Sequence, residues 1–162
     1  MQVIHYKTGK LFEASCALGA LLASGSSEQY QAAEAYGRHI GTTFQLVDDI
    51  LDYTASAEQM GKNAGDDLRE GKPTLPLIYL LDHGTAEQKK LVKNAIEQAE
   101  ELPEDLFQQV YQAIMESKAI EYTQAAAERE AQLAKDALAC FPKNAATQSL
   151  MDLCDYSLKR ST

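Results

Sequence analysis

The sequence contains few residues that interrupt helices. Only 4 prolines and 9 glycines occur among 162 residues, and runs of β-branched residues are nearly absent. The apolar residues are mainly alanine and leucine, which favour helix. We therefore expect an all-α fold. Because this length suffices for one hydrophobic core and does not require two, we expect residues 1–162 to form one helical domain or part of one.

Other absences exclude several functional classes. The formal net charge of -9 disfavours binding to nucleic acid or to an anionic membrane, since both are negative. No apolar run reaches the roughly 20 residues of a transmembrane helix, and no secretion signal is present. The 3 cysteines form no CxxC pair and the 3 histidines are scattered, which disfavours a zinc site. We expect buried thiols and a cytoplasmic location.

Apolar periodicity predicts six helices. They cover residues 1–23 with a flexible joint at Thr8-Gly9, and residues 27–53, 75–82, 86–100, 104–139 with a break near 117, and 145–159. The intervening segment 54–73 lacks periodicity and contains three glycines. Because an irregular stretch of this length in a compact domain usually has a function, we expect an active-site loop there.

An acidic stripe lies near the end of the second expected helix. Asp48, Asp49 and Asp52 occupy positions i, i+1 and i+4, which brings three carboxylates toward one face. Like charges at this spacing repel and favour a bound cation. Magnesium fits, because it binds carboxylate oxygens and shares them with substrate phosphates. The alternative is an ordinary solvated acidic helix end.

Neutral residues extend the stripe toward the start of the helix. Gln45 lies one turn before Asp48 and Asp49, and Gly41 lies one turn further back. Glycine destabilises a helix interior, so Gly37 and Gly41 indicate either a bulky ligand or a closely packed neighbouring helix. The two explanations remain open from the sequence.

Lysines near the stripe strengthen the indication of a phosphate ligand. Lys62 and Lys72 lie in the glycine-rich segment, and Lys7 lies at the Thr8-Gly9 joint. Ammonium groups together with magnesium neutralise a diphosphate. Each lysine alone is typical of a solvated surface, so only their occurrence together is informative. Asp66-Asp67 in the same segment is not counted as a metal site, because it lacks a second turn of carboxylates.

Four segments match, in order and spacing, the motifs of a known family. They are Lys7-Thr8-Gly9, GTTFQLVDDILDYT at 41–54, Gly61-Lys62 and GDDLREGKPTLP at 65–76. The chain thus resembles the trans-polyprenyl diphosphate synthases, specifically from Lys7 to Pro76. The resemblance implies the C-terminal half of an all-α isoprenoid synthase bundle, in which Asp48, Asp49 and Asp52 bind Mg²⁺. It also implies that diphosphate is bound by Lys7, Thr8, Gln45, Lys62 and Lys72. Of these, Lys7, Gln45 and Lys72 would act in catalysis together with Asp48. The resemblance further implies a pocket lined by Gly41 and Phe44.

The implied reaction adds isopentenyl diphosphate to an allylic diphosphate. Magnesium and the lysines draw off the diphosphate, and the double bond of isopentenyl diphosphate attacks the allylic cation. The resemblance favours the long-chain, octaprenyl-type members, which make quinone (ubiquinone) side chains. Family members are homodimers packed through long helices, and residues 11–22 or 40–51 are the candidate contact faces here.

The family's first aspartate-rich motif and its basic isopentenyl diphosphate site have no counterpart in this sequence. We therefore expect a truncated synthase, cut within a helix and inactive alone. A non-catalytic partner subunit of a heteromeric prenyl diphosphate synthase is the alternative, although it would have no need for the complete set of diphosphate-binding residues. A terpene cyclase fragment is a third possibility, disfavoured by Lys7-Thr8-Gly9 and by GKPTLP at 71–76.

Overall fold

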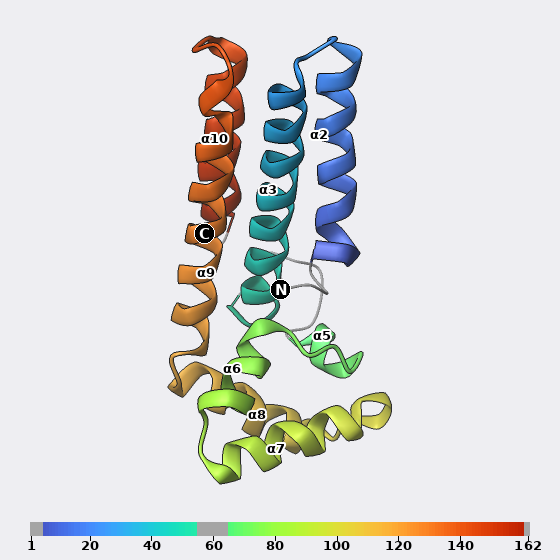
Figure 1. Ribbon diagram of the computed structural model, residues 1–162. Coiled ribbons are helices and arrows are strands. Elements are labelled where there is room, and N and C mark those ends of the chain that lie inside the picture. Colours follow the sequence, from blue (N-terminus) through green and yellow to red (C-terminus); the bar gives the residue numbers. More distant parts are fainter. Residues whose placement is uncertain (1–4, 55–64, 161–162) are drawn as a thin grey trace. The chain divides into compact units, whose positions relative to one another are not determined.

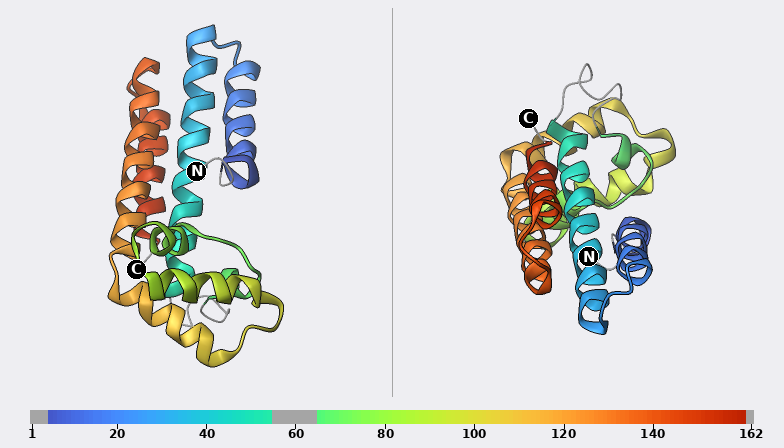
Figure 2. Two further views of the ribbon diagram at one scale, coloured as in Figure 1. Left: turned by 60° about the horizontal axis from the view of Figure 1, so that its bottom comes forward. Right: turned by 90° about the horizontal axis from the view of Figure 1, so that it is seen from above.

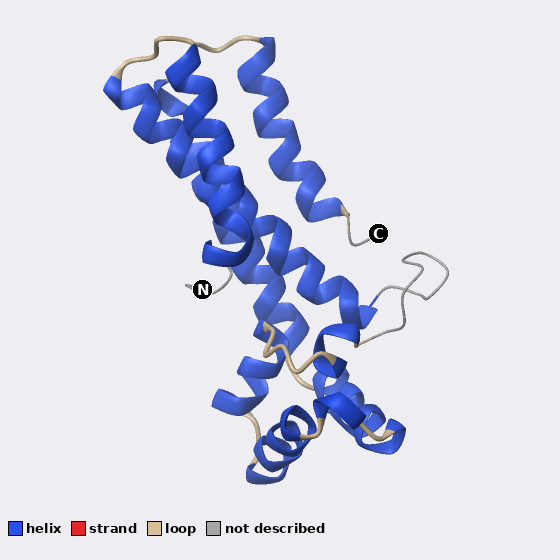
Figure 3. Cartoon of the chain, turned by 90° about the vertical axis from the view of Figure 1, so that its right-hand side faces the viewer, coloured by secondary structure: helices blue, strands red, loops and turns tan. Residues whose placement is uncertain are grey.

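Helices form every regular element in the part of the chain that the structure describes. The computed structural model describes residues 5–54 and 65–160, and no strand occurs within these ranges (Figures 1 and 3). The all-α fold class is confirmed. The α-helices are α2 (Lys10–Leu22), α3 (Ser27–Thr54), α5 (Asp66–Arg69), α6 (Leu75–His83), α7 (Ala86–Glu97), α8 (Glu104–Glu116), α9 (Ala119–Ala137) and α10 (Ala145–Lys159). A π-helix, η1 (His5–Gly9), and two 3-10 helices, η2 (Ala99–Glu101) and η3 (Leu138–Cys140), complete the set.

Two expected local features take a different form. The joint at Thr8-Gly9 is a π-helical turn that leads directly into α2. The segment 54–73 is not irregular throughout, because Thr54 ends α3 and Asp66–Arg69 form the one-turn helix α5. Residues 55–64, which include Lys62, lie outside the described residues. The break near residue 117 is confirmed, and there the Ser117 hydroxyl accepts the Ala119 N–H at 3.1 Å.

The chain folds into two compact units. Unit 1 comprises residues 5–47 and 126–160 of the described chain, and unit 2 comprises residues 48–54 and 65–125. The division falls inside α3 and inside α9, so each of these helices contributes to both units. The single domain expected for residues 1–162 stays a prediction.

Unit 1 is built around the first part of α3. In this unit α3 lies between α2 on one side and α9 with α10 on the other (Figures 1 and 2). Tyr36 is buried in its core, and its hydroxyl donates to the Leu150 carbonyl at 2.9 Å. Asn144 starts α10, since its side chain accepts the Thr147 N–H at 3.0 Å. The core consists of Tyr36, Ile40, Ala131, Ala134, Leu138 and Cys154, with Phe12 and Cys16 of α2 packed against it.

Unit 2 has a separate hydrophobic core, which lies between α6, α7, α8 and the end of α3. Its fully buried side chains include Tyr53, Leu68, Leu77, Leu80, Val92, Val110 and Ile114. Thr85 and Gln88 form a reciprocal capping box that starts α7. Pro76 stands in the first turn of α6, where a proline loses no helical hydrogen bond.

Two expectations about burial need correction. Cys154 is buried, but Cys16 and Cys140 are only half-buried. Residues 40–51 cannot form an exposed dimer face, because Ile40, Val47, Ile50 and Leu51 are all buried within the chain. The other candidate face, residues 11–22, exposes several leucines. None of the described helices is both long and apolar enough to cross a membrane.

Candidate functional site

The acidic stripe lies at the end of α3, in unit 2, and is largely withdrawn from solvent. Asp49 retains 3% of its accessible surface and Asp52 retains 8%, whereas Asp48 is half-buried. Buried carboxylates need hydrogen-bond donors or a cation to remain charged. This burial disfavours the interpretation of the stripe as a solvated helix end.

Asp49 faces the start of α6. Its Oδ2 lies 3.5 Å from the backbone nitrogen of Leu75, the first residue of that helix. Thr74 is the N-cap residue but makes no capping bond with its own side chain. Its hydroxyl lies instead 3.5 Å from the Tyr53 hydroxyl. The Asp49 carboxylate therefore takes the position of an N-cap and lies at the positive end of the α6 dipole.

Asp52 faces the start of α5. Its Oδ2 accepts the Asp67 N–H at 3.3 Å, and its carbonyl accepts the Gly65 N–H at 2.8 Å. Gly65 has φ 78°, and a Cβ atom there would lie 2.0 Å from the Phe107 ring. Only glycine fits this turn without a shift of the surrounding structure. The turn brings Asp66 and Asp67 back to the end of α3.

The pKa of the Asp52 carboxyl is raised to about 6 from its ordinary value of 3.8. Burial is the largest cause, followed by the negative charge of Asp67, and the carboxylate of Asp66 adds to the shift. The backbone N–H groups of Asp67 and Asp66 offset part of it. Asp66-Asp67 was not expected to belong to the site, so the structure adds these residues to it. Their proximity arises from the chain reversal at Gly65, which periodicity does not reveal.

Lys72 carries a positive charge beside this acidic group. Its Nζ lies 3.1 Å from Oδ1 of Asp67 and also contacts the Glu70 carboxylate. The hydrogen bonds to Glu70 and to Asp67 raise the pKa of Lys72. Its side chain is 41% exposed, so the ammonium is accessible to a ligand. A diphosphate would bind it in competition with Asp67 and Glu70.

The expected convergence of Asp48, Asp49 and Asp52 on one point is not found. In the described part of the chain, no three acidic, histidine or cysteine side chains are arranged as a metal site. The physical reason is that the carboxylates of Asp49 and Asp52 are each directed at a different helix N-terminus. The residue types still suit a hard divalent cation, because carboxylate oxygens are its usual protein ligands.

A second group of expected site residues lies in unit 1. The Thr8 hydroxyl donates to Oε1 of Gln45 at 2.8 Å and thus joins η1 to α3. Phe44 is half-buried, with its ring centroid 5.7 Å from that of Phe12. The Arg160 guanidinium stacks on the Phe44 ring, 4.0 Å from its centroid, a contact that no local sequence pattern predicts because the two residues are far apart in the chain. The side chain of Lys7 and all of Lys62 lie outside the described residues.

The two helix glycines are explained by close packing within unit 1. A Cβ atom on Gly37 would lie 2.5 Å from the Phe12 carbonyl oxygen and 2.7 Å from Cα of Glu13. A Cβ atom on Gly41 would lie 2.9 Å from Cα of Gly9. These backbone contacts identify helix packing as the role of both glycines, and the ligand explanation is not needed for them.

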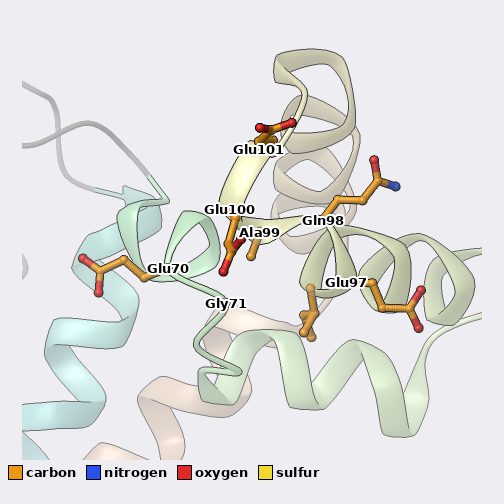
Figure 4. A pocket seen from close by; sticks show the side chains of 8 residues that line it. Glu70, Gly71, Glu97, Gln98, Ala99, Glu100 and Glu101 are labelled. Carbon is orange, nitrogen blue, oxygen red and sulfur yellow. The ribbon is translucent and has the colours of Figure 1, made fainter.

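A pocket in unit 2 contains none of the expected site residues. It lies between the turn after α5 and the junction of α7 with η2 (Figure 4). Its lining consists of Glu70, Gly71, Ile96, Glu97, Gln98, Ala99, Glu100 and Glu101. Four carboxylates in such a wall repel an anionic ligand.

Comparison with known proteins gives consistent similarities. The polyprenyl synthetase family profile matches residues 1–114. Octaprenyl diphosphate synthase of Haemophilus influenzae is 43% identical over 161 residues, which are 99% of this chain and 48% of that protein. Heptaprenyl diphosphate synthase component 2 of Geobacillus stearothermophilus is 38% identical over 157 residues, which are 97% of this chain and 48% of that protein.

A solved structure has the same fold. The polyprenyl synthase of Caulobacter crescentus, complexed with calcium and isoprenyl diphosphate, superimposes with a TM-score of 0.90 at 38% identity. The match covers 99% of this chain and 48% of that one. This chain thus spans about half the length of each of these three proteins.

Proposed function

Because the chain belongs to the polyprenyl synthetase family, we propose that it provides the second aspartate-rich half of a trans-prenyltransferase. The complete enzyme adds isopentenyl diphosphate to an allylic diphosphate and makes a long-chain polyprenyl diphosphate, a quinone side-chain precursor of the octaprenyl type. In this reaction the C–O bond of the allylic diphosphate breaks and releases diphosphate. A C–C bond forms to isopentenyl diphosphate, which then loses a proton. The chain alone, without a first aspartate-rich motif, is inactive.

The observation that carries this proposal is the buried acidic group at the end of α3. Burial raises the pKa of Asp52 to about 6, and the negative charges of Asp67 and Asp66 add to the shift, so ionisation of this carboxyl is unfavourable. A divalent cation would stabilise the ionised carboxylate. The Caulobacter crescentus relative is complexed with calcium and isoprenyl diphosphate, which supports a divalent cation and a prenyl diphosphate as ligands here. We propose that the resident cation is Mg²⁺.

The proposed roles are those that the family resemblance implies for each residue. Asp48, Asp49 and Asp52 would hold Mg²⁺, which when bound would offset the negative charge of the diphosphate leaving group. Binding requires the carboxylates of Asp49 and Asp52 to turn from the helix N-termini that they now face. Lys72 exchanges its carboxylate partners for diphosphate oxygens and thereby stabilises their charge. The family resemblance implies that Thr8, Gln45, Lys7 and Lys62 also bind diphosphate, for which the Thr8 hydroxyl would exchange Gln45 Oε1 for a diphosphate oxygen. Phe44 would border the hydrocarbon, and Gly41 keeps α3 close to η1.

Calorimetric titration with farnesyl diphosphate tests the proposal. The chain should bind it in the presence of Mg²⁺ and lose at least about tenfold in affinity on removal of Mg²⁺, on Asp48→Ala, or on Lys72→Ala. Asp82→Ala on an exposed helix end is the matched control and should bind as the wild type does. Binding that is equally strong without Mg²⁺, or in Asp48→Ala, would contradict the proposal.

A non-catalytic partner subunit is the second candidate function. The Geobacillus stearothermophilus relative is one component of a heptaprenyl diphosphate synthase, which favours a chain that acts within a complex. In this case the chain would bind a full-length synthase, and Asp48→Ala would leave the activity of that complex unchanged. Loss of activity in the variant complex would exclude this candidate.

Assembly and location extend the main proposal. We propose that the complete enzyme forms a homodimer, as the resemblance implies. Size-exclusion chromatography with light scattering on the complete enzyme should give a mass twice that of one complete enzyme chain. A cytoplasmic location stays the expectation drawn from the composition.

A further inference from the structure

A buried carboxylate lies on the face of α2 that packs against the core of unit 1. Glu13 is 5% exposed, and the residues beside it on this face are the apolar Phe12, Cys16 and Ala17. Burial of a carboxylate is costly unless the group is paired and hydrogen-bonded. The presence of Glu13 among apolar residues therefore requires an explanation that packing alone does not supply.

Two basic side chains compensate the charge of Glu13. Its Oε1 lies 2.5 Å from Nζ of Lys10, one turn earlier on the same helix, and its Oε2 accepts the Nε–H of Arg38 at 3.2 Å. Burial raises the pKa of Glu13, but the hydrogen bonds from Lys10 and Arg38 outweigh it and hold the pKa below its ordinary value. Of these two contacts, only that with Arg38 joins α2 to α3.

The ion pair belongs to a row of contacts between α2 with η1 and the neighbouring helix α3, which lies beside α2 (Figures 1 and 2). Arg38, Gly41 and Gln45 stand at positions i, i+3 and i+7 of α3 and therefore share one face. A Cβ atom on Gly41 would meet the backbone of η1 at 2.9 Å, and Oε1 of Gln45 accepts the Thr8 hydroxyl at 2.8 Å. The Glu13 pair thus lies at one end of this row, and the Thr8–Gln45 hydrogen bond lies at the other.

Apolar and close backbone contacts alone do not fix the position of α2 along α3. The hydrophobic effect is non-directional, and a helix backbone presents a similar surface at every turn. A buried ion pair adds little net stability over apolar residues, and its best-attested role is to fix register. A shift of one residue moves a helix about 1.5 Å along its axis, which is enough to break the 2.8 Å hydrogen bond between Thr8 and Gln45.

We propose that Glu13 is a positioning residue, which through Arg38 fixes the register of η1 and α2 on α3 and thereby holds the Thr8 hydroxyl beside Gln45. The chain from Thr8 to Glu13 is helical without interruption, so a displacement at Glu13 is transmitted to Thr8. Because Thr8 and Gln45 belong to the diphosphate-binding set, the consequence for binding rests on the proposed function, whereas the register itself does not.

A double-mutant cycle between Glu13→Met and Thr8→Val tests the coupling by urea unfolding of the chain. Methionine suits the apolar neighbours of Glu13, and Arg38 is 46% exposed and stays solvated, so the variant should remain folded. Thr8→Val removes the hydroxyl that donates to Gln45 and should raise the unfolding equilibrium constant of the wild type about threefold to tenfold. In the Glu13→Met background it should change this constant less than about twofold, because the hydrogen bond is already lost.

Two further substitutions are matched controls. Glu13→Gln keeps an oxygen that can accept the Arg38 Nε–H, so the effect of Thr8→Val should be retained. Lys10→Gln removes the other basic partner of Glu13 but no contact between α2 and α3, and should also leave the effect of Thr8→Val unchanged. A role of Glu13 in stability alone would alter the unfolding of each variant without altering the effect of Thr8→Val.

Calorimetric titration with farnesyl diphosphate and Mg²⁺ gives a second readout. Glu13→Met should weaken binding about threefold to tenfold, and Glu13→Gln should bind within about twofold of the wild type. If the wild-type chain did not bind farnesyl diphosphate, the proposed function would fail, whereas the double-mutant cycle would still decide the role of Glu13.

Two results would overturn the proposal. One is an equal effect of Thr8→Val in the wild type and in Glu13→Met. The other is a wild-type chain that binds farnesyl diphosphate no more tightly than Glu13→Met does. If Glu13→Met did not fold, Arg38→Met would take its place in both experiments, because it breaks the same pair from the more exposed side.

Discussion

Replacement of Asp52 by asparagine is expected to stabilise the chain at neutral pH. Its carboxyl is 8% exposed and lies against Asp67, so ionisation there is unfavourable. Asparagine keeps an oxygen that can accept the Asp67 N–H, now bonded at 3.3 Å, and removes the charge. The substitution therefore preserves the contact with α5 while relieving the repulsion.

The magnitude follows from the pKa of Asp52, which is raised from 3.8 to about 6. A shift of roughly two units corresponds to about 3 kcal/mol, an upper value for the penalty of ionisation. Because the folded-state pKa lies above the unfolded-state value, the folded chain binds more protons between about pH 4 and 6. The contribution of Asp52 to the free energy of unfolding therefore falls as the pH rises through this range. At pH 7 the penalty is complete, and Asp52→Asn should raise the free energy of unfolding by about 1–3 kcal/mol.

Urea unfolding followed by circular dichroism measures this effect. The free energy of unfolding of the variant is compared with that of the wild type at pH 4, 5, 6 and 7 in the absence of divalent cations. The difference should be near zero at pH 4 and grow to its full value by pH 7. Mg²⁺ should stabilise the wild type more at pH 7 than at pH 5, and should stabilise Asp52→Asn little. Asp82→Asn is the control and should show no such trend. A variant that is less stable than the wild type at pH 7, or a difference independent of pH, would refute the reasoning.

Three further substitutions test backbone and packing arguments by thermal unfolding. Gly37→Ala should destabilise the chain by about 1–3 kcal/mol, since its Cβ atom would lie 2.5 Å from a backbone oxygen; an unchanged midpoint would contradict the close packing. Ser24 has φ 54° after the end of α2, so Ser24→Gly should stabilise the chain by about 0.5–1 kcal/mol, whereas Ser27→Gly, at the start of α3, should not stabilise it. Gly65→Ala should lower the free energy of unfolding by more than about 2 kcal/mol, because φ is 78° and the new methyl group would lie 2.0 Å from the Phe107 ring. It should also reduce the stabilisation by Mg²⁺. Unchanged stability and unchanged stabilisation by Mg²⁺ would show that Gly65 does not hold α5 in place.

The positions of the helices were largely predictable, because helix propensity, capping and apolar periodicity act over a few residues. The helix expected at 145–159 is found as Ala145–Lys159, and the stop at Ser117 is correct. The spacing of Asp48, Asp49 and Asp52 likewise identified the acidic stripe, since one helical turn determines which side chains share a face. The family motifs located the diphosphate-binding candidates in the same way.

Only the tertiary structure decided what the stripe contacts and how far it is buried. Asp52 meets Asp67 across 15 positions of sequence, and Asp49 meets Leu75 across 26, because glycine turns and the unit 2 core return the chain to α3. The role of Gly37 and Gly41 also depends on neighbours that lie far away in the sequence. Local patterns specify which residue types face the same way, whereas burial and charge compensation depend on contacts between distant segments.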